Sequence, residues 1–281
     1  MLWTRAALLL LVVATASEGQ TWRTLDVSRQ LRDTSEHHIK VRYSAGKFTM
    51  TPTDEPVLFS MQLRYDDERT RPVHEYDPVA RSATLGVEGQ NIRLARHFNE
   101  KNAGEMRLGL SNAVPLDLDL ELGATQARVD AGGLALNNLR VVTGAADAVL
   151  DFSAPNKARM RHLDVNLGAA GFAITNLGNA NVAAIRVDGG VGRVDLDFGG
   201  AIQQDVSVDA NVALGKLTLH VPEDVGIRVE VQRLLASFDH PGLYKRGNAY
   251  YSDNWDTAKV RIRVRAETVF GAIEIDRARP R

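Results

Sequence analysis

Acidic side chains recur in this sequence at regular intervals, mostly of 21 to 24 residues. Stacked carboxylates raise the local negative potential, and calcium takes several oxygen ligands, so such a column is a candidate site for a cation or a cationic polymer. The alternative is a solvated polar face, because outward positions on a strand are polar in any protein. We expect the polar face and assign no metal ligand. Five of the seven positions in this column are acidic: Asp130, Asp151, Thr175, Asp197, Thr218, Asp239 and Glu274.

A second group of candidate residues lies in an insertion, residues 240–258. Aromatic rings beside hydrogen-bonding groups can stack on sugar rings or dock a partner. The alternative is a loop that shields the apolar end of the last repeat. Together with the acidic column, the insertion defines a candidate ligand or partner surface of Asp130, Asp151, Asp197, Asp239, Tyr250, Tyr251 and Trp255.

Motifs for catalysis are missing from the sequence. It contains neither H-E-x-x-H nor a G-x-S-x-G nucleophile elbow, and it has no cysteine. His37 and His38 are neighbours, so in a strand they point to opposite faces and cannot share one metal ion. The glycine-rich stretch "GGVGRVDLDFGG" leads into a strand pattern rather than the helix N-terminus that a phosphate site uses. We therefore predict no catalytic residue, no metal and no cofactor.

The elements that carry these side chains form a repeat. The stretches "LDLDLELG", "LRVVTG", "LDVNLG", "IRVDGG", "VSVDAN" and "IRVEVQ" each alternate apolar and polar residues, which is the pattern of a strand. Recurrence of the whole unit predicts an all-β domain over residues 111–281, a β-solenoid of about seven stacked two-strand coils. A long β-sandwich is the competing fold. It would need antiparallel hairpins, but two-residue turns of the Asn-Gly type are missing here.

Alignment of the repeats also aligns charges. One outward column reads Asp119, Arg140, Asp164, Arg186, Ser207, Arg228 and Arg263. The first four alternate in sign, and opposite charges on neighbouring strands attract. This alternation supports the alignment independently of the apolar residues.

An expectation about the two ends of the repeat domain depends on the same alignment. Arg261, Arg263 and Arg265 fall on the last repeat, and Asp117, Asp119 and Glu121 fall on the first. Opposite charges at two ends would favour head-to-tail stacking of molecules, or would protect edge strands, and we expect protection.

The stretch "VNLGAAGFAITNLGNA" raises a question of its own, because Asn176 stands in a column of otherwise mostly apolar residues. It either points inward and needs partners, or the turn of this repeat comes earlier than the alignment places it.

Composition and the N-terminus bound the location of the protein. An apolar run follows Arg5, and Ala14-Thr15-Ala16 forms an A-x-A site, which predicts a secretory signal peptide over residues 1–16 and an exported, periplasmic or extracellular chain. After cleavage we expect no integral membrane segment. A formal net charge of −1 gives no reason to expect nucleic acid. Residues 17–110 are predicted to form a β-rich N-terminal module.

The sequence also resembles a known family. "LELGATQARVDAGGLALNNLRVVTGAADAVLDFSAP" and "VNLGAAGFAITNLGNA" resemble the toast-rack family of bacterial envelope β-repeat proteins. "HVPEDVGIRVEV" and "YYSDNWDTAKVRIRVRAETVFGAIEI" resemble the related C-terminal domain of LiaF-type cell-wall-stress proteins. The resemblance implies a β-solenoid scaffold and brings no catalytic motif.

Three hypotheses about function follow. The first is a non-enzymatic envelope protein that acts as a structural scaffold, adhesion or interaction module, with an envelope protein or cell-wall glycan as its partner. The second is a polysaccharide-binding or polysaccharide-modifying β-solenoid, supported by the acidic column and the Tyr/Trp insertion. The third, a regulatory partner of a membrane envelope-stress system, rests on the resemblance alone.

Overall fold

The computed structural model describes residues 21–89 and 103–278, so the predicted signal peptide lies outside the described residues. The expectation of an all-β protein is confirmed. The strands are β1 (Trp22–Gln30), β2 (His37–Thr53), β3 (Val57–Asp66), β4 (Thr70–Asp77), β5 (Ser82–Gly89), β6 (Glu105–Ser111), β7 (Pro115–Asp130), β8 (Ala135–Thr143), β9 (Asp147–Asp151), β10 (Met160–Thr175), β11 (Val182–Asp197), β12 (Val206–Pro222), β13 (Gly226–Asp239), β14 (Leu243–Arg246), β15 (Ala249–Ser252) and β16 (Arg261–Ala278).

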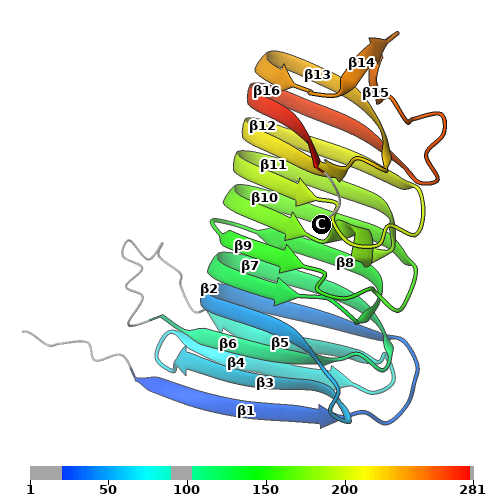
Figure 1. Cartoon of the computed structure of the whole chain (residues 1–281). Helices are drawn as coiled ribbons and strands as arrows, with labels where there is room; N and C mark the ends of the chain where they lie inside the picture. Colours follow the sequence, from blue (N-terminus) through cyan, green and yellow to red (C-terminus); the bar gives the residue numbers. More distant parts are fainter. Residues whose placement is uncertain (1–20, 90–102, 279–281) are drawn as a thin grey trace, which may run out of the picture.

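The long strands lie on one another as a stack of bent rungs (Figure 1). From β2 the order is β7, β8 with β9, β10, β11, β12, β16 and β13, and each rung pairs parallel with the next. These rungs do not form the antiparallel hairpins that a β-sandwich would need. At the N-terminal end β1, β3 and β6 pair antiparallel, and β6 and β5 each pair parallel with β2. The N-terminal strands therefore continue the same sheet.

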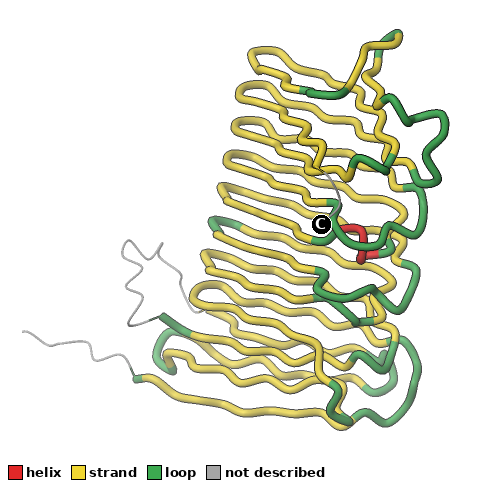
Figure 2. Tube along the Cα trace, in the orientation of Figure 1, coloured by secondary structure: helices red, strands yellow, loops and turns green. Residues whose placement is uncertain are grey.

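Each long rung bends once in its middle, which divides it into two arms (Figure 2). At three successive rungs the bend uses a glycine with a φ of 137–143°, a backbone conformation that side chains disfavour: Gly192, Gly215 and Gly271. Gly46 in β2 has a φ of 123°. The stretch "HHIKVRYSAGKFTMTPT" is thus one bent strand.

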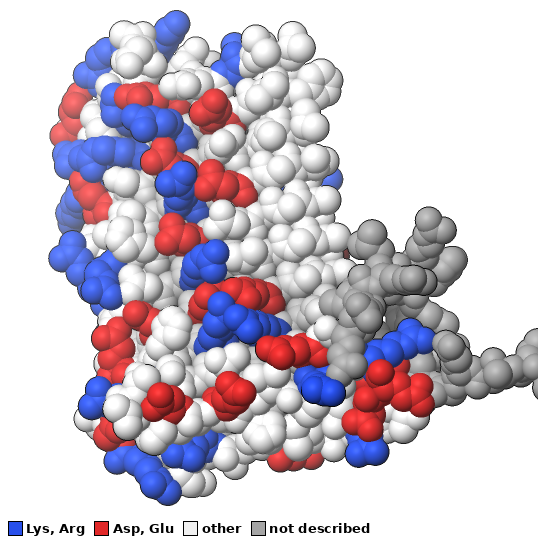
Figure 3. Space-filling view, turned by 180° about the vertical axis from the view of Figure 1, so that it is seen from behind, with Lys and Arg blue, Asp and Glu red and all other residues white. Residues whose placement is uncertain are grey.

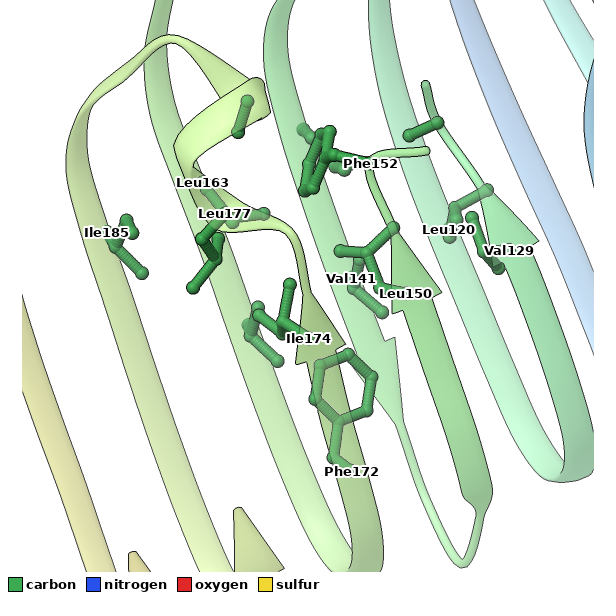
Figure 4. Packing of buried hydrophobic residues seen from close by; sticks show 14 of the residues in the cluster. Leu120, Val129, Val141, Leu150, Phe152, Leu163, Phe172, Ile174, Leu177 and Ile185 are labelled. Carbon is green, nitrogen blue, oxygen red and sulfur yellow. The ribbon is translucent and has the colours of Figure 1, made fainter. Parts of the chain in front are cut away.

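The apolar core lies between the two arms and runs through the whole stack (Figure 4). Leu118, Leu139, Leu163 and Ile185 stand opposite one another on successive rungs, as the alignment predicts. Every one of them is buried. A repeat has no core of its own, because its apolar side chains are covered only when the next rung packs beside it.

The polar residue Asn176 does not enter the core. It lies half-buried at the start of a three-ten helix, η2 (Leu177–Ala180), with a φ of 58°. Its Nδ2 donates to Asp151 Oδ1 at 2.7 Å. Leu177 takes the inward position instead and is buried among the core residues that Figure 4 shows. The turn therefore comes earlier than the alignment placed it.

Side-chain amides close the corner opposite the bend. Asn156 bonds to the backbone of Leu136, Asn179 Nδ2 donates to the Phe152 carbonyl, and Gln204 Nε2 donates to the Asn181 carbonyl. Each of these bonds links a loop to a neighbouring rung. Asn179 and Asn181 of "TNLGNAN" thus satisfy backbone groups that the end of a strand leaves unpaired.

The repeat alignment is correct from β7 to β11 and wrong by two residues between β11 and β12. Arg186 stands opposite Asp209 rather than Ser207, and Ile185 stands opposite Val208 rather than Val206. A shift of two residues keeps every side chain on the same face of a strand, so apolar alternation cannot detect it. The bend glycines do detect it, because Gly192, Gly215 and Gly271 stand in one row.

With the alignment corrected, the charge alternation extends over eight rungs. We call this row the charge ladder: Lys40, Asp119, Arg140, Asp164, Arg186, Asp209, Arg265 and Glu230. Figure 3 shows acidic and basic side chains interleaved along one face of the stack. Asp119 lies 3.6 Å from Lys40 Nζ and 3.2 Å from Arg140 Nη1. Each side chain of the interior of the ladder therefore has opposite charges on both neighbouring rungs.

The ladder predicts the effect of reversing one charge. Asp164→Arg places a cation between Arg140 and Arg186 and should lower the free energy of unfolding by about 1–2 kcal/mol, because two attractive pairs become repulsive. Asp195→Arg is the control, since Asp195 faces Ala173 and Thr218. Urea unfolding at low salt measures the difference. Equal effects of the two reversals would show that the ladder contributes nothing.

The last strand in sequence is not the last rung. β16 inserts between β12 and β13, so Arg263 and Arg265 lie inside the stack. Asp119 and Glu121 are also internal, because β2 covers β7. The expectation of oppositely charged ends, whether for head-to-tail stacking or for edge protection, is therefore wrong. The sequence could not show the position of β16, because β13 comes before β16 in the chain. In the folded sheet, however, β16 lies between β12 and β13.

Candidate interaction surfaces

The acidic column follows the second arms, and its carboxylates are held by the fold. Ser153 Oγ donates to Asp130 at 2.7 Å, and the Gly132 amide donates to the same carboxylate at 2.8 Å. Thr175 Oγ1 donates to Asp151 at 2.6 Å, and the Gly199 amide donates to Asp197 at 2.9 Å. These bonds hold the turns that follow the strands. A carboxylate can accept hydrogen bonds from backbone amides that no longer pair with a neighbouring strand.

The structure brings only part of the predicted column together. Asp130 and Asp151 are neighbours, but the two-residue shift puts His220 beside Asp197. Asp239 stands opposite Glu274, in a different row. Over residues 21–89 and 103–278, no three His, Asp or Glu side chains gather in a way that could hold a metal ion.

A recess of about 1280 Å³ opens where the second arms of β11, β12 and β16 end. Asp197, His220 and Asp276 lie at its wall, and His220 Nδ1 is 2.9 Å from Asp276 Oδ2. Asn254 Nδ2 donates to the Glu223 carbonyl, while its buried Oδ1 has no hydrogen-bond partner among the described residues. Lys259 and the apolar side chains of Ile202 and Val260 are among its other lining residues. The recess offers donors, acceptors and both signs of charge to a polar ligand.

The insertion forms a hairpin, β14 and β15, and β15 pairs with the first part of β13 at Arg228 and Val229. Tyr250 packs against Phe238, with ring centroids 4.9 Å apart and the rings edge to face, and against His240 at 4.5 Å. It also joins the edge of the main core. Tyr250 therefore covers part of the apolar core at this end of the stack, as a shielding loop would.

Tyr251 and Trp255 are half-buried and lie beside several guanidinium groups. Arg246 Cζ lies 4.4 Å above the Tyr251 ring, and Arg228 Nε donates to Tyr251 Oη at 3.0 Å. Arg263 lies 5.7 Å from the centre of the Trp255 ring. The hydrogen bond to Tyr251, with further contributions from the charge of Glu230, raises the pKa of Arg228 above its ordinary value. A sugar ring that stacked on this face of Tyr251 would have to displace Arg246, which also pairs with Asp256.

Sequence reasoning missed the recess and an exposed apolar edge along the bends. The recess combines strand ends that the alignment placed in different rows, so only the corrected register reveals it. The signal for the edge was present in the sequence as apolar residues at the bends. Val191, Leu214 and Phe270 each precede a bend glycine, and Leu234 and Leu235 precede Ala236, which stands opposite Gly271. The repeat pattern does not say that the bend faces outward.

Among the residues the structure describes, no helix is long and apolar enough to cross a membrane. No curated protein matches the chain.

Several solved structures align with most of this chain, but their sequence identity to it is low. A proposed cell adhesion protein from Clostridium sporogenes is 16% identical, with a TM-score of 0.48, over 92% of this chain and 100% of its own. A proposed adhesin from Bacteroides fragilis is 12% identical, with a TM-score of 0.41, over 92% of this chain and 98% of its own. A proposed adhesin from Parabacteroides distasonis is 12% identical, with a TM-score of 0.28, over 91% of this chain and 97% of its own.

The family comparison gives a direct result. The model for the N-terminal domain of toast_rack, DUF2154, matches residues 16–171, which is more than half of the chain. The chain belongs to the toast-rack family.

Proposed function

We propose that this protein is an exported, non-enzymatic envelope protein whose rungs form a β-solenoid scaffold that presents interaction surfaces. The observation that carries the proposal is the continuous core from β2 to β13, aligned along its outer face by the charge ladder. Such a body is rigid along its length and holds side chains at fixed spacings of about 4.8 Å. Rigid spacing is what a scaffold supplies to its partners.

The carboxylates of the acidic column support the same proposal. Asp130 and Asp151 accept hydrogen bonds from Ser153 and Thr175 of the next repeat, so they connect rungs. Asp197 accepts from the Gly199 amide and holds the turn that follows its own strand. A general acid or base needs a proton-transfer partner in a cleft. The carboxylates of Asp130 and Asp151 are instead occupied by hydrogen bonds to Ser153 and Thr175.

Export and partner binding are testable together. Fractionation of the native host should place a chain processed after Ala16 in the envelope, and mass spectrometry of the N-terminus checks the processing. Trp255→Ala should lower crosslinking to envelope components about fivefold, because it removes an aromatic contact of the hairpin surface. Trp22→Ala is the matched control, since Trp22 lies at the opposite end of the stack under Arg64. An unprocessed cytosolic chain would contradict the proposal.

A second function, polysaccharide binding, is favoured by the recess beside His220 and Asp276. Isothermal titration with soluble cell-wall glycan fragments should then show binding that Asp276→Asn weakens about tenfold, equivalent to one lost charge-assisted hydrogen bond. Asp253→Asn is the control, because Asp253 is exposed and lies outside the recess lining. Equal binding by both variants would remove this function from the recess.

A further inference from the structure

Large apolar side chains are exposed along one edge of the stack. Of the eight large hydrophobic residues that are exposed in the described part of the chain, six lie at the bends of β11, β12, β16 and β13. Their exposed fractions run from 44% for Leu214 to 74% for Leu234. We call this edge the bend ridge: Val191, Leu214, Leu234, Leu235, Val269 and Phe270. Gathering of this kind marks an interaction surface, whereas single exposed apolar residues need no explanation.

The register makes the ridge continuous. Val191 stands opposite Leu214, Leu214 opposite Phe270, and Phe270 opposite Leu235. Neighbouring rungs are about 4.8 Å apart, so these side chains are in reach of one another. The previous rung, β10, has Ala169 opposite Val191. The ridge therefore belongs to the C-terminal half of the stack and ends at its outermost rung.

The ridge is convex, because it follows the outside of the bends. In Figure 1 the bends of β11, β12, β16 and β13 lie above one another at the left of the stack. In Figure 3, seen from behind, few charged side chains lie on the upper right-hand edge. A convex apolar edge does not receive a helix or an extended peptide as a groove does. It suits insertion into a soft apolar layer.

Cationic side chains border the ridge. Arg193 and Lys216 line a shallow hollow of about 690 Å³ beside Val191, and both are exposed. Lys216 also contacts Glu274. Arg233, next to Leu234, is exposed and donates to the Ala236 carbonyl at 2.8 Å. Glu267 is an exposed carboxylate nearby, so the border is mixed, with three cations against two anions. Guanidinium and ammonium groups beside exposed apolar chains match the phosphates of a lipid surface.

The size of the ridge argues against a stable dimer. Six partly exposed side chains of this size offer on the order of 500 Å², whereas a stable protein interface buries about 800 Å² on each partner. We propose that the bend ridge docks the protein on an anionic lipid membrane, with Phe270, Leu234 and Leu235 in the interfacial layer and Arg193 at the phosphates. This surface is separate from the hairpin and the recess, so the proposal goes beyond the scaffold function and does not depend on its partner.

Vesicle flotation tests the proposal with the processed protein from an exporting host. Vesicles of phosphatidylcholine with phosphatidylglycerol should bind it, and pure phosphatidylcholine should bind it several-fold less, because the cations then lose their anionic partners. The double variant Leu235→Ser with Phe270→Ser should bind at least about tenfold more weakly, because two apolar side chains that would enter the membrane are lost. Val79→Ser is the matched control, as Val79 is 90% exposed and lies between β4 and β5, away from the ridge.

The remaining outcomes are equally decisive. Arg193→Glu should weaken binding to the anionic vesicles and leave binding to phosphatidylcholine unchanged. The substituted side chains are exposed, so the thermal midpoint of each variant should match that of the unchanged protein, which separates lost binding from lost folding. Absence of vesicle binding, or equal loss with Val79→Ser, overturns the proposal. Light scattering that shows a dimer abolished by Phe270→Ser would also overturn it and assign the ridge to a second copy.

Discussion

Replacing Gly215 by alanine is expected to lower the free energy of unfolding by about 4 kcal/mol, which is a large part of the stability of an ordinary domain. Gly215 has a φ of 143° at the bend of β12. A Cβ atom there would lie 1.8 Å from the Gly192 carbonyl oxygen of the neighbouring rung. The carbonyl oxygen belongs to the backbone, and the Cβ position is fixed by the backbone, so neither atom can move without disturbing the register. Because the rungs share one core, the loss should appear in the main unfolding transition.

The matched control for this substitution is Gly171→Ala. Gly171 lies near the bend of β10, and the closest atom to its Cβ would be Asp147 Oδ1 at 3.6 Å, an ordinary contact. Chemical denaturation followed by circular dichroism compares the two variants. If Gly215→Ala is as stable as Gly171→Ala, the bends are not held by contact between backbones of adjacent rungs.

Asn156→Ala is expected to cost about 3 kcal/mol, although the residue lies in a loop. Asn156 is 4% exposed, and its side chain makes three bonds. Oδ1 accepts from the Leu136 amide at 2.8 Å, and Nδ2 donates to the Leu136 and Ala158 carbonyls at 2.9 Å each. Alanine would leave these buried backbone groups without partners. Each buried group that water does not reach costs about 1–3 kcal/mol when it is unpaired.

Asn137→Ala serves as the control for Asn156→Ala. The Asn137 side chain donates to Glu36 at 2.9 Å in an exposed position, so we expect a change within about 0.5 kcal/mol. Hydrogen exchange of the Leu136 amide adds a local measurement. Unchanged protection of that amide in Asn156→Ala would show that water replaces the side chain, and the predicted loss would be wrong.

The sequence predicts the strands well because burial imposes a period of two. The apolar side chains of β7, β8, β10 and β11 stand opposite one another as the repeats align them. The charges of Asp119, Arg140 and Asp164 were found for the same reason. Local chemistry was also sufficient to predict the polar insertion, which proves to be a hairpin.

The candidate site was predicted only in part. Asp130 and Asp151 are neighbours as expected, and Tyr251 and Trp255 form one cluster. Asp239 separates from Asp197 because the β11–β12 step is two residues longer than the alignment assumed. That difference lies in the loop before Val206, and alternation of period two carries no information about it.

Local alternation, repeat length and bend glycines are properties of neighbouring residues, so the sequence alone determined that the chain is all-β and which side chains face inward. The insertion of β16 between β12 and β13, the eight-rung charge ladder, the recess and the bend ridge depend on which strands become neighbours in space. Pairing of distant strands is decided by the joint burial of the whole stack and by contacts between backbones, as at Gly192 and Gly215. No single repeat contains that information, and only the assembled tertiary structure expresses it.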